Sequence, residues 1–120
     1  MERTLAAFAD HLAVEKGLSA NTVEAYLRDL RDYGEFLRGR GVVAWEDAQR
    51  QDLVDFISHM QRKMGLARST IARRLSSVRS LYRFLLREGV TERDPSANLD
   101  LPKRPDRLPK VLSVEECLRL

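Results

Sequence analysis

The sequence predicts an all-α protein built as a compact bundle of four helices. Apolar residues recur at spacings of three and four in four consecutive segments, the pattern of helices that each bury one face. No segment shows the strict alternation of polar and apolar residues that indicates a half-buried strand. With 43% hydrophobic residues in 120, the composition favours one domain with its own core over a disordered chain.

The first two helices are expected at residues 4–16 and 21–38. Gly17 lies between them, where a glycine in the left-handed conformation commonly ends a helix. Ser19 and Asn21 both offer a side-chain oxygen that can cap the second helix. The two apolar stripes consist of Leu5, Phe8 and Leu12, and of Val23, Tyr26, Leu27, Leu30, Tyr33 and Leu37.

The next two helices are expected at residues 49–64 and 68–87, each followed by a glycine. Trp45 precedes them, and we expect it to pack the connection from the second helix. Three aspartates near the start of the third helix are expected to be exposed, where they favour the helix dipole: Asp47, Asp52 and Asp55. The apolar stripes are Leu53, Phe56, Ile57, Met60 and Met64, and Ile71, Leu75, Val78, Tyr82 and Leu85.

The composition changes after Gly89. All four prolines follow it, and residues 98–110 are predicted to form an extended linker, because a proline disfavours helical conformation in the residue before it. Ser113-Val-Glu-Glu116 then has the pattern of a capping box, which predicts the start of a further helix. We therefore expect one domain with its linker over residues 1–108, and the first residues of a second, truncated domain over residues 109–120.

Basic and acidic residues are separated along the chain. Residues 1–61 hold seven basic and eleven acidic side chains, and residues 88–120 hold six and seven. Between them, residues 62–87 hold eight basic side chains and no acidic one. Such a concentration of positive charge is typical of a segment that meets phosphate groups, and a solvated basic face without a partner is the alternative.

The outward face of the fourth helix predicts a contact with DNA. Arginine forks onto phosphates or guanine edges, and small hydroxyl residues let a helix backbone approach closely. A helical wheel places opposite the core Ser69, Arg73, Ser76, Ser80, Arg83 and Arg87, with Thr70 and Ser77 at one margin and Arg74 and Arg79 beside the core stripe. On the second helix, the outward residues of the first half are Asn21, Thr22, Ala25 and Arg28, and the aspartates further along argue against a contact there.

Several classes of function are excluded or disfavoured by composition. The single Cys117 excludes an internal disulfide and a multi-cysteine metal site, and the two histidines lack the spacing of a zinc site. No Ser/His/Asp set or phosphate-binding glycine loop occurs, so we expect neither a catalytic residue nor a cofactor in this chain. No apolar run is long enough to span a bilayer, and no signal peptide opens the chain, so a cytoplasmic protein is expected.

Four stretches resemble, in order, the amino-terminal region of Xer-type tyrosine recombinases of the phage integrase family. GLSANTVEAYLRDL at 17–30 resembles the start of the family's amino-terminal domain, and LARSTIARRLSSVRSLYRFL at 66–85 resembles the family's fourth helix. DPSANL with LPK, within 94–103, resembles the exit from the domain, and LPKVLS at 108–113 resembles the entry to the catalytic domain. The resemblance covers nearly the whole chain.

The resemblance implies a SAM-like core-binding domain that forms one jaw of a clamp on duplex DNA. It implies that the whole protein is a site-specific recombinase that cuts and rejoins DNA as a synaptic tetramer, in chromosome dimer resolution or integration, with its catalytic residues in the other domain. The second and fourth helices face the major groove of one half-site, which assigns contacts to Asn21, Thr22, Ala25, Arg28, Ser69, Thr70, Arg73, Arg74 and Ser77. Arg79 and Arg83 are assigned to phosphates or solvent.

Two other functions fit the same helices. One is a protein-interaction module in which the basic helix docks an acidic partner. The other is a helix-turn-helix regulator in which residues 64–69 form the turn. Salt dependence separates DNA binding from the first alternative, because each neutralised phosphate releases counterions.

Overall fold

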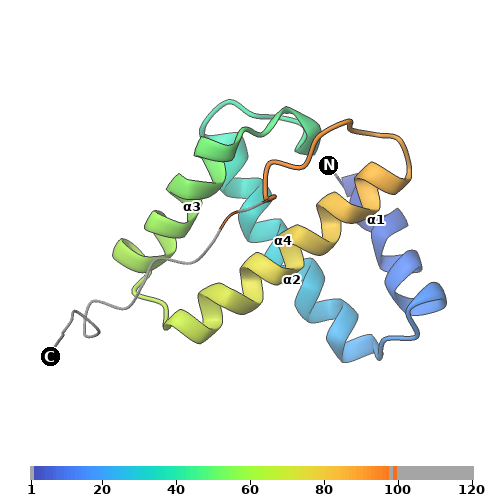
Figure 1. Ribbon diagram of the computed structural model, residues 1–120. Helices are drawn as coiled ribbons and strands as arrows, with labels where there is room; N and C mark the ends of the chain where they lie inside the picture. The colour runs from blue at the N-terminus through green and yellow to red at the C-terminus, as the bar shows by residue number, and fades with distance from the viewer. Residues whose placement is uncertain (1, 98, 100–120) are drawn as a thin grey trace, which may run out of the picture.

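The computed structural model describes residues 2–97 and 99, and every element in this part of the chain is helical, which confirms the predicted all-α fold. The α-helices are α1 (Glu2–Asp10), α2 (Ala20–Gly39), α3 (Arg50–Arg62) and α4 (Arg68–Arg87) (Figure 1). A π-helical segment, η1 (His11–Glu15), continues α1, and a 3-10 turn, η2 (Trp45–Asp47), precedes α3. The predicted linker, apart from Leu99, and the predicted helix from Ser113 lie outside the described residues.

The first predicted helix forms as α1 and η1 together. Its stripe is buried as predicted, with Leu5, Phe8 and Leu12 each at most 2% exposed. Gly17 follows with a φ of +65°, a conformation that glycine adopts without steric cost. Of the two candidate caps for α2, Ser19 is used: its Oγ accepts a hydrogen bond from the Thr22 backbone N–H at 3.2 Å.

The region around the start of α3 departs from prediction at two aspartates. One is Asp55, which is half-buried and whose Oδ2 lies 2.8 Å from Arg40 Nη2. Trp45 is 2% exposed, so its predicted packing role is confirmed. Asp52, however, is 7% exposed, because its carboxylate has two partners that draw it inward. It accepts hydrogen bonds from the Gln49 backbone N–H at 2.8 Å and from Arg40 Nε at 2.9 Å. The expectation that Asp52 is an exposed dipole charge is therefore wrong.

The end of α3 also differs from prediction. The helix ends at Arg62, and the chain turns through Gly65 at a φ of +64°. Met64 therefore leaves the line of the apolar stripe and is 43% exposed, so its predicted place in the core is wrong.

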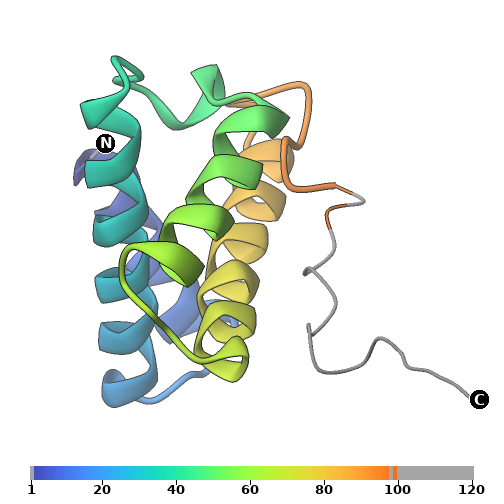
Figure 2. The ribbon, with the colours of Figure 1, turned by 90° about the vertical axis from the view of Figure 1, so that its left-hand side faces the viewer.

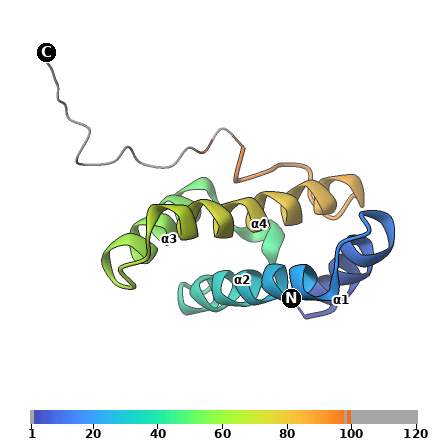
Figure 3. The same cartoon turned by 90° about the horizontal axis from the view of Figure 1, so that it is seen from below.

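Helices α2 and α4 cross each other and form the centre of the bundle (Figure 1). Both begin at the same end of the molecule, as the view turned by 90° also shows (Figure 2). Seen from that end, α2 begins on the side of α1 and α4 begins beside the end of α3, so the first turns of the two helices diverge from their crossing (Figure 3). Two helix N-termini, with their free N–H groups and positive dipole ends, therefore lie at the same end of the molecule, on either side of the crossing.

Candidate nucleic-acid interface

A hollow of about 430 Å³ lies between the N-terminal halves of α2 and α4. Residues Asn21, Thr22 and Ala25 of α2 line one side, and Arg73, Ser76 and Ser77 of α4 line the other. Five of these were predicted from the sequence as DNA contacts, on two segments about fifty residues apart in the chain. The fold therefore brings the two sets of candidates together.

The polar floor of the hollow is Asp29, which is only 1% exposed. One of its carboxylate oxygens, Oδ2, accepts a hydrogen bond from Arg73 Nη1 at 2.9 Å and another from Ser77 Oγ at 3.0 Å. A buried carboxylate is tolerable only when it is paired and hydrogen-bonded, and here both conditions are met from α4.

Arg74 joins the same group from the other side. Its Nη1 donates to Asp32 Oδ2 at 2.6 Å, and its Nε lies 3.7 Å from Asp29 Oδ1. That Nε and Oδ1 are buried without a hydrogen-bond partner, so they attract each other as charges at slightly more than bonding distance. We call these five residues the α2–α4 charge cluster: Asp29, Asp32, Arg73, Arg74 and Ser77.

The charge cluster changes how the basic segment has to be understood. Residues 62–87 contain no acid, but two acids reach Arg73 and Arg74 from α2 and balance their charge. Ser77, expected at the margin of an outward face, is 1% exposed and points its hydroxyl to Asp29. The sequence of the fourth helix alone does not reveal this pairing, because both acids come from α2. The signal for it in the sequence is the three-residue spacing of Asp29 and Asp32, which places them on one face of α2.

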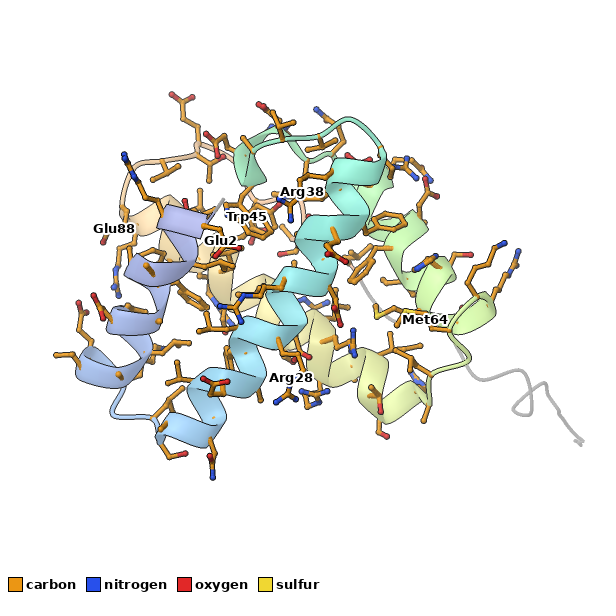
Figure 4. The ribbon with its side chains drawn as sticks, turned by 180° about the vertical axis from the view of Figure 1, so that it is seen from behind. Glu2, Arg28, Arg38, Trp45, Met64 and Glu88 are labelled. Atoms are coloured by element: carbon orange, nitrogen blue, oxygen red, sulfur yellow. The ribbon has the colours of Figure 1, made fainter. Side chains whose placement is uncertain are left out.

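The remaining candidates form a less constrained group. Ser69 is exposed and Thr70 is half-buried in the first turn of α4, while Arg79 is half-buried further along the same helix. Arg28 and Arg83 are exposed and have no acidic partner among residues 2–97 and 99. Figure 4 shows Arg28 on the first half of α2 and Arg38 near the opposite end of that helix. Arg28 and Arg83 are therefore free to bind an anion such as a phosphate group.

Other titratable groups are engaged in packing. Burial raises the pKa of Tyr33 and of Tyr82 well above the ordinary value, so both hydroxyls stay neutral at physiological pH. Arg87 reaches back to η1, where its Nη2 lies 2.9 Å from His11 Nδ1 and 3.3 Å from Glu15 Oε1. Within the described ranges, no three His, Cys, Asp or Glu side chains gather into a metal site.

None of the helices in the described part of the chain has the length and apolar character that crossing a membrane requires.

Comparison with known proteins gives a consistent result. The family model of the phage integrase N-terminal SAM-like domain matches residues 5–89. The chain is 42% identical to tyrosine recombinase XerC of Roseiflexus castenholzii, over all of the chain and 39% of that protein. It is 44% identical to XerD of Rhizobium meliloti, over 95% of the chain and 36% of that protein.

A third similar protein is tyrosine recombinase XerC of Pseudomonas putida, at 42% identity over all of the chain and 40% of that protein. The chain thus spans about two fifths of the length of the curated relatives it matches.

Proposed function

Because the chain belongs to the phage integrase N-terminal SAM-like domain family, we propose that it is the DNA-binding amino-terminal domain of a site-specific tyrosine recombinase. In this proposal it holds one half-site of duplex DNA and catalyses nothing by itself. The whole protein cuts and rejoins DNA together with other recombinase subunits in a synaptic tetramer, in chromosome dimer resolution or integration. It works in the cytoplasm, where the DNA is accessible.

The observation that carries the proposal is the hollow between the first halves of α2 and α4. Small side chains line it, so the two helix backbones can approach a groove closely: Thr22, Ala25 and Ser76. The N-terminus of α2 lines this hollow, and the N-terminus of α4 lies at the same end of the molecule, so both helix dipoles add positive potential there. Base-edge contacts are assigned to the lining, and phosphate contacts to the free arginines.

Individual roles follow from exposure and partners. Arg73 is 49% exposed and lines the hollow, so it is the member of the charge cluster that can reach a base edge. Asn21, Thr22, Ser69 and Thr70 offer amide and hydroxyl groups near the two helix starts. Phosphate contacts are assigned to Arg28, Arg79 and Arg83, and Arg74 and Ser77 act from inside the cluster by holding Asp29 and Asp32.

The test is fluorescence anisotropy with the 120-residue chain and a labelled 30-base-pair duplex over a range of salt concentrations. Binding to DNA should weaken steeply with salt, by a log–log slope of about −0.9 for each neutralised phosphate. Arg28→Gln should reduce the magnitude of that slope by about 0.9, the contribution of one phosphate. Arg38→Gln removes the same charge from the same helix, roughly 15 Å away along its axis, and should leave the slope unchanged.

Two results would contradict the proposal. One is the absence of any binding to duplex DNA at about 50 mM salt, where electrostatic contacts are strong. The other is an equal effect of the two α2 variants, because binding would then depend on net charge alone and not on this face.

Reversing both charges with Arg73→Glu and Arg74→Glu, an obvious choice from the sequence, is a poor test. It would place two further carboxylates against Asp29 and Asp32, and Arg74 is only 13% exposed. A loss of DNA binding in this variant would then be explained by unfolding of the domain and would not identify a DNA contact.

A further inference from the structure

We propose that Asp29 is a positioning residue that holds Arg73 for a base edge and keeps it from binding phosphates indiscriminately. The inference rests on the proposed function, since it assigns a task within the same DNA-facing surface. Asp29 carries a negative charge and, in this proposal, does not contact DNA itself. From composition alone, such a residue would count as evidence against DNA binding.

The first step is the geometry of Arg73. Its guanidinium has five N–H donors, and Asp29 engages it through Nη1 at 2.9 Å. The other nitrogens have no partner among the described residues, and Arg73 is half exposed where it lines the hollow. One edge of the guanidinium is therefore anchored, and the rest is available to the paired acceptors O6 and N7 of a guanine.

The second step is the rigidity of the anchor. Asp29 is 1% exposed, so its carboxylate cannot turn into water. The Ser77 hydroxyl holds the same oxygen that Arg73 contacts, and Arg74 lies beside the other oxygen. An arginine held in this way loses little freedom on binding, which favours a contact of fixed geometry.

The third step is electrostatic. Paired with a buried carboxylate, Arg73 attracts any passing phosphate less than a free arginine does. A guanine edge presents neutral acceptors, so it can bind the exposed donors while the ion pair stays intact. Asp29 therefore lowers affinity for random DNA and preserves affinity for one base pair, which is how discrimination against wrong partners arises.

The experiment measures discrimination directly with the 120-residue chain. A duplex is selected by the wild-type chain from a randomised 30-base-pair library, and affinities are measured for this selected duplex and for the unselected pool. The wild type should prefer the selected duplex by at least about tenfold, the size of one good bidentate base contact. Asp29→Asn should bind the pool more tightly and lose most of that preference.

A second variant keeps the inference testable if Asp29→Asn does not fold, as judged by circular dichroism. Arg73→Lys retains the charge and its pairing with Asp29 but removes the forked donor geometry. It should bind the pool as well as the wild type does and lose about tenfold preference for the selected duplex. Arg38→Lys, on α2 and outside the DNA-facing surface, is the matched control and should change neither affinity.

The outcomes separate the two proposals. If the wild type binds neither duplex, the proposed function falls and the inference falls with it. If the wild type binds both but prefers neither, or if folded Asp29→Asn or Arg73→Lys keeps the full preference, DNA binding stands and the role of Asp29 is refuted. Loss of preference in Arg38→Lys as well would also refute it, since the effect would then not be specific to the anchored arginine.

Discussion

Helices α2 and α4 contact each other in two regions, one of which pairs charged side chains and the other of which buries neutral ones. Near their N-termini the contact is the α2–α4 charge cluster, in which two acids balance two arginines at the edge of an open hollow. Further along, the contact is made by Tyr33 and Tyr82, both fully buried, with Trp45 stacked on Tyr33. We call this second region the tyrosine core. Asp32 and Tyr33 are neighbours in sequence, so one helical step separates an ionic region from a neutral one.

The tyrosine core satisfies its polar atoms without charge. Tyr82 Oη donates to the Trp45 backbone oxygen at 2.7 Å, so the Tyr33 hydroxyl must be the donor in the 2.8 Å bond between the two tyrosines. The ring of Phe56 packs against Tyr33 with centroids 5.2 Å apart. Buried hydroxyls in such a chain are stabilising only while every member has its partner.

The charge cluster has a different energetic role. Arg73 is half exposed, so water and salt screen its ion pair, and such pairs contribute little to stability. In the proposed function, the same helix pair therefore folds through its tyrosine core and binds DNA beside its charge cluster. Four measurements test this division, from the largest expected effect to the smallest.

Trp45→Ala should have the largest effect on stability. Removing a fully buried indole leaves a cavity and should lower the free energy of unfolding by about 3–5 kcal/mol in a urea titration. Val43→Ala is the control in the same loop, since Val43 is 71% exposed, and should change stability by less than about 0.5 kcal/mol. Equal losses of stability in the two variants would mean that the connection between α2 and α3 contributes nothing to the core.

Alkaline pH should destabilise the chain through the tyrosine core. Burial raises the pKa of Tyr33 and Tyr82 in the folded state, so their stabilising effect is complete below the unfolded value near pH 10 and is lost as pH rises above it. Each tyrosine should lower the free energy of unfolding by up to about 1.4 kcal/mol for each pH unit above about pH 10. Chemical denaturation at pH 10 and pH 11 measures the loss. A Tyr33→Phe, Tyr82→Phe double variant that loses as much stability as the wild type would disprove this cause.

The two tyrosines should respond unequally when each is changed alone. Tyr82→Phe leaves the Tyr33 hydroxyl without its acceptor and the Trp45 oxygen without this donor, which should cost about 1–3 kcal/mol. Tyr33→Phe leaves Tyr82 with its bond to Trp45 and should cost no more than about 1 kcal/mol. Thermal unfolding of the two variants checks the order, and the reverse order would contradict the hydrogen-bond direction.

Arg73→Gln should have the smallest effect on stability. The Arg73 side of the ion pair is half exposed, and Asp29 keeps its hydrogen bond from Ser77 and its charge contact with Arg74, so we expect a loss below about 1 kcal/mol in urea. We also expect a clear loss of affinity for duplex DNA. The variant thus separates binding from folding. A large loss of stability with unchanged DNA affinity would assign the charge cluster to the fold instead.

Much of the fold follows from local patterns. The stripe of Leu5, Phe8 and Leu12 and the capping oxygen of Ser19 were readable because helix period and caps depend on residues only a few positions apart. The errors occurred where long-range contacts decide. Asp52 is drawn inward by Arg40, twelve positions away, and Met64 is exposed because the helix ends two residues before it.

The sequence by itself determined the helices, the glycine turns between them and the concentration of basic residues in the fourth helix, because each of these is a property of neighbouring residues. Only the tertiary structure decided which charges on that helix are free. Asp29 and Arg73 are 44 positions apart, and no local rule pairs them. The crossing of α2 and α4 does so, burying a carboxylate beneath the residues predicted to meet DNA, because a buried charge requires a partner from whichever helix packs against it.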